Sequence, residues 1–172
     1  MNFEPAPEME KRRPDLEAMV RQYGNGLLRM CFLYLRDVSL AEDAVQETFA
    51  AAWAKYDSFA GRSSEKTWLT AIAANVCRNM LKSAWHRHMA GPDGLESLSV
   101  SGPDVRDPTV TRAVLALPTP LREVVVLHYY RGLRVETIAS MLKLPRPTVS
   151  SRLARARKKL RNELKEWYFN EE

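Results

Sequence analysis

The chain has 172 residues, of which 45% are hydrophobic and 27% are charged, a balance typical of a folded globular protein. Its 26 basic and 21 acidic residues give a net charge of +5, which suits a polyanionic partner without requiring one. The sequence contains no apolar run near the roughly 18 residues of a membrane span, no signal-peptide pattern at its N-terminus and no glycine-rich phosphate loop.

The two cysteines, Cys31 and Cys77, both lie within apolar helical patterns. Free cysteines in such positions behave as small buried hydrophobic residues. We therefore expect reduced core thiols in a cytosolic protein, and no disulfide framework.

Hydrophobic residues recur at helical spacing in three stretches of the first half, 16–35, 41–56 and 68–81. Three amphipathic helices bury their apolar stripes by packing together, which predicts a small helical bundle over residues 14–89, after a tail at 1–13.

Two further signals mark the ends of these helices. Ser39 and Glu42 form a capping-box pattern at the start of the second stretch. The polar, glycine-containing segment YDSFAGRSS at 56–64 predicts a loop between the second and third helices.

Residues 90–108 have the composition of a flexible linker, with three of the seven glycines and three of the ten prolines. They carry four acidic residues against one basic residue. The second domain is expected over 109–172, with helices at 109–117, 121–131, 134–142 and about 147–167.

The last two of these helices match a helix-turn-helix. The pattern needs a small residue where the helices touch and an apolar residue early in the second helix, and Ala139 and Val149 supply them around a tight turn at 143–145. Lys143 stands where many such turns have glycine, which costs roughly 1 kcal/mol if the turn requires a positive φ.

Basic residues are concentrated in the same region. Residues 134–165 contain ten basic and two acidic residues, and this net +8 exceeds the charge of the whole chain. A basic face on the second helix is typical of a reader of the DNA major groove. The alternative is a solvated basic helix in a bundle.

Three segments together carry a family resemblance: AEDAVQETFAAAW (41–53), FAGRSSEKTWLTAIAAN (59–75) and the stretch from Leu117 to Arg161. In content and order they resemble the extracytoplasmic-function (ECF) sigma factors, the minimal members of the sigma-70 family. The resemblance implies an all-α chain with two small helical domains, sigma region 2 and sigma region 4, joined by a flexible linker.

The resemblance also implies a function. Such a protein is a transcription initiation factor and not an enzyme, and it has no cofactor and no metal. Its partners are core RNA polymerase, promoter DNA (single-stranded at the −10 element and duplex at the −35 element) and an anti-sigma factor, without a stable homo-oligomer. Its expected place is the cytoplasm, or the inner face of the membrane where the anti-sigma factor is membrane-bound.

Residues on the second helix match the family's contact with the clamp of the polymerase's largest subunit: Asp43, Gln46 and Glu47. Spacings of three and four place them on one helix face. Because acidic groups repel DNA, an acidic face on a basic protein favours a cationic protein partner. The alternative is a solvated polar face.

The resemblance places the −10 contacts in the loop after the second helix and along the third helix. These residues are Phe59, Arg62, Ser63, Ser64, Asn75, Arg78 and Lys82. Phe59 would stack on an unpaired base while the polar residues donate to base edges and phosphates. For Phe59 the alternative is core packing, and for Trp68 we favour the core. Glu65 and Lys66 replace aromatic residues that the family often has.

In the last helix, the residues that match the −35 base contacts are Ser150, Ser151, Ala154 and Arg155. Those that match phosphate contacts, which position the helix without reading sequence, are Thr148, Arg152, Arg157 and Lys158. Ser150 replaces a common basic residue and Pro147 a common glycine, so the −35 preference is expected to differ from that of relatives.

Two other functions compete with this interpretation. A repressor or activator with its own helical sensor domain explains the second half equally well, but not the acidic helix or the FAGRSS loop. A metalloenzyme would use His86 and His88 near Cys77, although histidines two residues apart point to different helix faces. The tail at 1–13 and the C-terminal WYFNEE have no assigned role.

Overall fold

The computed structural model describes residues 15–87 and 107–168, with the side chains of 84–87 and 166–168 left aside. In these ranges the chain forms only helices, which confirms the predicted all-α fold class. The elements are α1 (Leu16–Leu35), α2 (Val38–Lys55), the 3₁₀ turn η1 (Tyr56–Ser58), α3 (Glu65–Arg87), α4 (Pro108–Ala116), α5 (Thr119–Val125), the π-helical segment η2 (Val126–Tyr130), α6 (Val135–Leu142) and α7 (Arg146–Tyr168).

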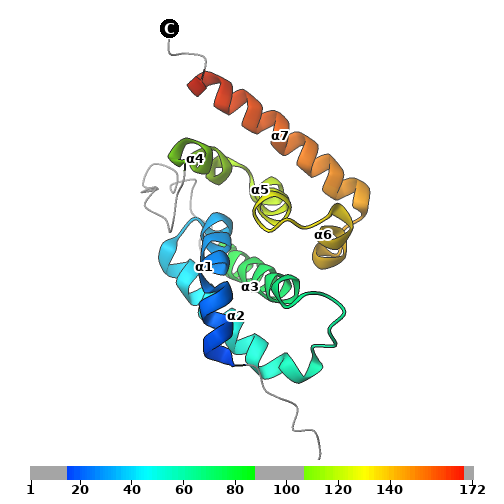
Figure 1. Ribbon diagram of the computed structural model, residues 1–172. Helices are drawn as coiled ribbons and strands as arrows, with labels where there is room; N and C mark the ends of the chain where they lie inside the picture. The colour runs from blue at the N-terminus through cyan, green and yellow to red at the C-terminus, as the bar shows by residue number, and fades with distance from the viewer. Residues whose placement is uncertain (1–14, 88–106, 169–172) are drawn as a thin grey trace, which may run out of the picture.

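Helices α1 to α3 form the first bundle, at the base of Figure 1. Their apolar stripes meet in a core in which Leu27, Ala44 and Leu69 are completely buried. The predicted three-helix arrangement is therefore correct, and the loop predicted at 56–64 consists of η1 and the irregular segment that follows it.

The start of α2 differs from the prediction. Asp37 is the N-cap, and its carboxylate accepts a hydrogen bond of 2.8 Å from the amide of Leu40. The helix begins at Val38, so Ser39 lies inside the first turn and cannot cap it. A carboxylate at the N-terminus also interacts favourably with the helix dipole, which explains why the earlier residue is used.

Helices α4 to α7 form the second bundle. The long helix α7 lies across α4, α5 and α6 (Figure 1) and buries Val149, Leu153 and Ala156 against them. Ala139 is buried where α6 meets α7, so the predicted helix-turn-helix is present.

The turn of the helix-turn-helix is a left-handed cap. Lys143 has φ 55°, and the amides of Lys143 and Leu144 donate to the carbonyls of Ser140 and Ala139. The turn therefore does require a positive φ at Lys143, the condition under which a residue other than glycine is strained.

The single helix predicted at 121–131 is two segments. α5 starts at Thr119, since Pro120 fits the first turn of a helix, where its missing amide needs no partner. After Val125 the backbone widens into η2, and the amide of Arg131 donates to the carbonyl of Val126. Periodicity alone does not distinguish a π-turn from an α-turn.

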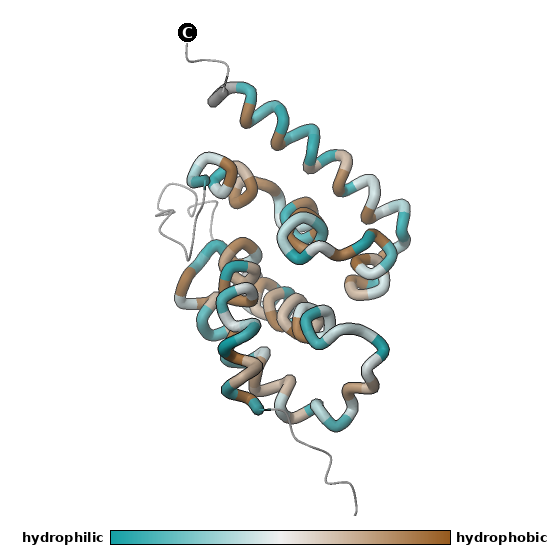
Figure 2. Tube along the Cα trace, viewed as in Figure 1, coloured by the Kyte–Doolittle hydropathy of each residue, from teal (hydrophilic) through white to brown (hydrophobic). Residues whose placement is uncertain are grey.

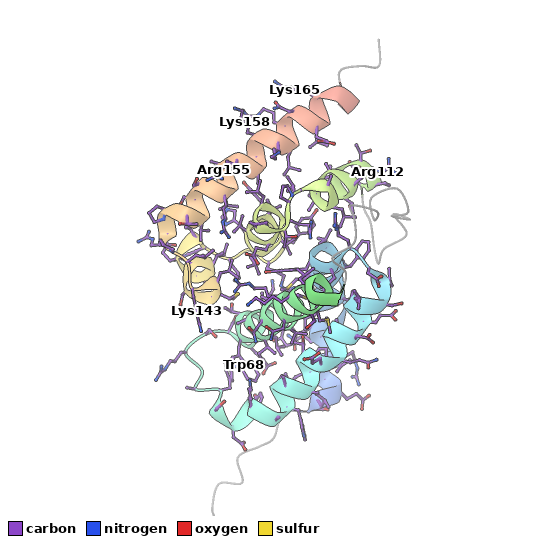
Figure 3. The ribbon with its side chains drawn as sticks, turned by 180° about the vertical axis from the view of Figure 1, so that it is seen from behind. Trp68, Arg112, Lys143, Arg155, Lys158 and Lys165 are labelled. Carbon is purple, nitrogen blue, oxygen red and sulfur yellow. The ribbon has the colours of Figure 1, made fainter. Side chains whose placement is uncertain are left out.

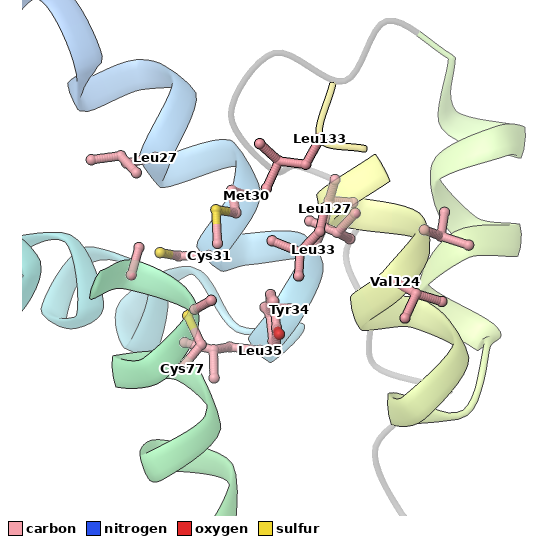
Figure 4. Packing of buried hydrophobic residues seen from close by; sticks show 14 of the residues in the cluster. Leu27, Met30, Cys31, Leu33, Tyr34, Leu35, Cys77, Val124, Leu127 and Leu133 are labelled. Atoms are coloured by element: carbon pink, nitrogen blue, oxygen red, sulfur yellow. The ribbon is translucent and has the colours of Figure 1, made fainter. Parts of the chain in front are cut away.

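The two bundles share one core, which the sequence did not predict. Leu33 of α1 lies beside Leu127 of the second bundle (Figure 4), and both side chains are buried, as are Tyr34 of α1 and Val124 of α5. The linker predicted at 90–108 lies outside the described residues apart from its last two positions, of which Asp107 caps α4. Among the described helices, none is long and apolar enough to cross a membrane.

The strained turn leads to a stability prediction. Lys143→Gly should raise the free energy of unfolding by about 0.5–1 kcal/mol, because glycine relieves the left-handed strain but has more unfolded-state entropy to lose. Urea denaturation measures this. Lys158→Gly is the control: it lies in the helical interior of α7 and should lower stability by about 1 kcal/mol. Two losses of equal size would contradict the strain assigned to Lys143.

Candidate functional site

An acidic groove lies between α2 and α3. Asp43 and Glu47 are exposed on α2, and Val76 and Met80 of α3 form part of the apolar floor. The full lining is Leu40, Asp43, Glu47, Val76, Asn79, Met80 and Ser83. Gln46 is exposed on the same helix, outside this lining. An apolar floor with a carboxylate wall fits a helix that carries both apolar and basic side chains.

The loop after α2 contains an aromatic cluster. The ring of Phe59 lies 4.8 Å from that of Trp68, and both lie 5.9 Å from the ring of Tyr56. Phe59 and Trp68 are half-buried. The packing alternative for Phe59 is therefore met in part, since one part of the ring packs on the cluster, while the other part is accessible.

The polar residues of the loop lie between Phe59 and Trp68 in the sequence. Arg62, Ser63 and Ser64 are exposed. The hydroxyl of Ser64 accepts a hydrogen bond of 3.1 Å from the amide of Thr67, so it caps α3. Gly61 has φ 67°, a conformation that favours glycine and sets the direction of the loop.

The predicted −10 residues of α3 differ in their surroundings. Asn75 and Lys82 are exposed. Arg78 is half-buried, and its Nε lies 3.5 Å from Oε2 of Glu123 in the second bundle. Arg78 is thus already paired with a carboxylate.

The residues of α7 are mostly hydrophilic along its length, with hydrophobic residues at intervals between them (Figure 2). Arg155, Lys158 and Lys165 lie along it, on the helix farthest from the first bundle (Figure 3). Ser150, Ser151 and Ala154 are exposed on the same side, and Thr148 is half-buried. The predicted base contacts therefore share one accessible helix face.

The three α7 arginines predicted to contact DNA have partners within the chain. Arg155 donates to Ser151 Oγ at 3.2 Å and Arg157 to the Tyr129 hydroxyl at 3.4 Å, both at the surface. Nη1 of Arg152 lies 3.6 Å from Oε1 of Glu123, at a side-chain exposure of 24%. Arg152 thus lies beside the buried Glu123 of α5, between α7 and the rest of the bundle.

Comparison with known proteins matches residues 19–87 to the model of sigma-70 region 2 and residues 109–160 to that of sigma-70 region 4. The ECF sigma factor SigW of Bacillus subtilis is 30% identical over 84% of this chain and 86% of its own length. The chain belongs to the ECF sigma factors of the sigma-70 family.

Two further similarities add detail. The probable sigma factor RfaY of Xanthomonas campestris is 32% identical over 81% of the chain, which spans only 38% of that relative's length. The fold is similar to that of the sigma factor RpoE from Bartonella quintana, solved with the anti-sigma factor NepR, with a TM-score of 0.70 and 24% identity over 88% of this chain and 97% of that one. Sigma factors as a class are transcription initiation factors and not enzymes.

The sigma factor also contains a buried polar cluster between its bundles that sequence reasoning missed. Arg122 and Glu123 are only 2% and 6% exposed. Arg122 donates to the backbone carbonyls of Leu117 at 2.7 Å and Tyr34 at 3.1 Å, and the Tyr34 hydroxyl donates to Glu123 at 2.7 Å. The sequence contains one sign of this cluster, because two adjacent charged residues, Arg122 and Glu123, interrupt the apolar run LREVVVL.

Burial changes the titration of this cluster. Desolvation, and then the nearby charge of Arg36, lowers the pKa of Arg122 to about 10. Desolvation and the Glu123 carboxylate raise the pKa of the Tyr34 hydroxyl. Tyr34 therefore stays protonated and donates its hydrogen bond throughout the physiological range.

A second polar contact joins the bundles. Nε and Nη2 of Arg131 donate to Thr70 Oγ1 at 3.0 and 2.9 Å, and both residues are buried. A Cβ on Gly26 would lie 2.9 Å from Arg131 Nη1, so the absence of a side chain there allows the guanidinium its place.

The two cysteines are buried neighbours in the core of the first bundle. A hydrogen bond with Cys31, together with burial, raises the pKa of the Cys77 thiol. Both cysteines are free and buried, as expected for core thiols. His88 and the side chain of His86 lie outside the described part of the chain. Within that part, no cluster of three histidine, cysteine or acidic residues is placed to hold a metal ion.

The aromatic cluster predicts a modest structural role for Phe59. Phe59→Ala should lower the free energy of unfolding by about 1–2 kcal/mol, because a half-buried ring loses its contacts with Trp68 and Tyr56. Arg62→Ala, at an exposed position of the same loop, should change it by less than about 0.5 kcal/mol. Chemical denaturation compares the two, and equal effects would contradict the packing of Phe59.

Proposed function

We propose that this sigma factor binds core RNA polymerase and directs it to promoters through −10 and −35 recognition, with region 2 at residues 14–89 and region 4 at 109–172. The observation that carries the proposal is the separation of charge on one chain. The accessible face of α2 is acidic and borders an apolar groove, whereas the accessible face of α7 is basic. These faces suit a cationic protein and a polyanion respectively.

In this proposal the groove between α2 and α3 receives a helical element of the polymerase. Asp43 and Glu47 pair with its basic residues, while Val76 and Met80 cover its apolar side. Gln46 contributes a hydrogen bond from the neighbouring position on α2. Charged groups at such an interface chiefly set specificity and association rate.

Promoter opening is then driven by binding energy. A base that leaves the duplex loses stacking of a few kcal/mol, which stacking on Phe59 and hydrogen bonds from Arg62, Ser63 and Ser64 offset. Asn75, Arg78 and Lys82 extend this path along α3. No chemical bond changes, so no catalytic group is required.

At the −35 element α7 enters the major groove. Arg155 donates two hydrogen bonds to a guanine edge, Ser150 and Ser151 contact neighbouring bases, and Ala154 offers a methyl contact. Thr148, Arg152, Arg157 and Lys158 hold the phosphates. Arg152 must leave Glu123 to do so.

Control by an anti-sigma factor completes the proposal. The Bartonella sigma factor of similar fold was solved with such a partner. The proposed location is the cytoplasm, or the inner membrane face where the anti-sigma factor is anchored there.

Binding to purified core polymerase tests the acidic groove. The double variant Asp43→Ala/Glu47→Ala should weaken binding at least about tenfold, or 1.4 kcal/mol, because it removes both carboxylates of the groove wall. Glu17→Ala/Asp57→Ala removes two other exposed acids of the first bundle and is the matched control. Size-exclusion co-elution and fluorescence titration measure the effect. A folded wild-type chain that fails to bind polymerase would refute the proposed function.

Selection from a random duplex library by the holoenzyme tests α7. Arg155→Ala should cost about 1–3 kcal/mol at preferred sites and relax the preference at one base pair. Lys158→Ala should weaken all sites equally and reduce the slope of log affinity against log salt by about one. Loss of sequence preference in Lys158→Ala, with none in Arg155→Ala, would overturn these assignments.

A further inference from the structure

Glu123 lies where the two bundles meet, and each of its carboxylate oxygens has a defined partner. Oε2 accepts from the Tyr34 hydroxyl at 2.7 Å and lies 3.5 Å from Arg78 Nε, both in the first bundle. Oε1 lies 3.6 Å from Arg152 Nη1 on α7. One carboxylate thus joins an arginine from each bundle.

Both of these arginines belong to the proposed DNA-contacting sets. Arg78 follows Asn75 on the −10 face of α3, and Arg152 lies among the phosphate contacts of α7. Guanidinium groups bind carboxylates and phosphates with the same donors. Contact with Glu123 and contact with a DNA phosphate therefore compete.

The carboxylate depends on these partners. The Glu123 side chain is 7% exposed, whereas Arg78 and Arg152 are 34% and 24% exposed. A buried carboxylate that loses its cations is strongly unfavourable, but a partly exposed arginine that moves to a phosphate keeps a partner. Separation of the bundles gives Glu123 the alternative of water.

The closed arrangement also conflicts with simultaneous promoter contacts. The −10 and −35 elements are named for positions about 25 base pairs apart, which corresponds to about 85 Å at 3.4 Å per base pair. The longest helices here, α3 and α7, have 23 residues each and are about 35 Å long. A chain in which α1 packs against α4 and α5 cannot reach both elements at once.

We propose that Glu123 acts as an internal substitute for DNA phosphate, which holds Arg78 and Arg152 in a closed, DNA-incompetent chain until DNA phosphates take both arginines. The occupant of the released surfaces is the promoter backbone. The DNA-competition step rests on the proposed function, whereas the closed arrangement itself rests on the contacts described above.

Energy transfer between two dyes follows the opening in the full chain. Ala54→Cys on α2 and Asn162→Cys on α7 provide exposed labelling sites in different bundles, and the native cysteines are buried. The transfer measured in the wild-type chain should fall as duplex DNA is added at low salt. Glu123→Gln removes the charge with little change in shape, and should lower transfer without DNA.

Binding to the same duplex DNA gives the second readout. Where nine-tenths of the molecules are closed, opening raises apparent affinity about tenfold, because only the open fraction binds. Glu123→Gln should therefore bind DNA up to about tenfold more tightly than wild type. Glu163→Gln removes an equal charge from the exposed part of α7 and should change neither transfer nor affinity by a comparable factor.

If Glu123→Gln misfolds, which circular dichroism detects, a second variant tests the proposal. Thr70→Val leaves Glu123 in place and removes the hydroxyl that accepts two hydrogen bonds from Arg131, so it should also open the chain and tighten DNA binding. Unchanged transfer in the folded variants, or opening without tighter DNA binding, overturns the proposal. Neither readout requires polymerase, so failure here is distinct from failure of polymerase binding.

Discussion

The arrangement of the two bundles depends on a pair of adjacent buried charges. Apolar contacts between α1 and the second bundle are not directional, so alone they would accept several alignments. Arg122 and Glu123 restrict them, because one binds the backbone carbonyl of Tyr34 and the other its hydroxyl. Buried ionic groups contribute little net stability when paired but are costly when unpaired, so they select the one alignment that satisfies every donor and acceptor.

The individual helices could largely be predicted from the sequence. Apolar spacing located α1, α2, α3 and the helix-turn-helix, since these features are local. The predictions failed where local signals compete. Asp37 caps α2 in place of Ser39. The π-helical segment η2 interrupts the helix predicted at 121–131, although the apolar residues there recur at helical spacing. A π-turn depends on tertiary packing, which no local pattern contains.

The same distinction between local features and tertiary contacts applies to the candidate site. Asp43, Glu47, Ser150, Ser151 and Arg155 are exposed on the helices where the resemblance placed them. The sequence did not predict the partner of Arg78 and Arg152. Both pair with Glu123, which lies 45 positions from Arg78 and 29 positions from Arg152, and a helical wheel would not assign this charged residue to the interface. Contacts between elements distant in sequence need the tertiary arrangement.

The core shared by the bundles bears on the fate of sigma factor molecules that have no polymerase. An open chain exposes Leu33 and Leu127 to water, and such surfaces promote aggregation and attract proteases. Closing is unimolecular and requires no chaperone or second protein. Sigma factor molecules without polymerase thus bury their own apolar surface. The cellular lifetime of this protein should depend on how quickly the two bundles of a released chain pack together again.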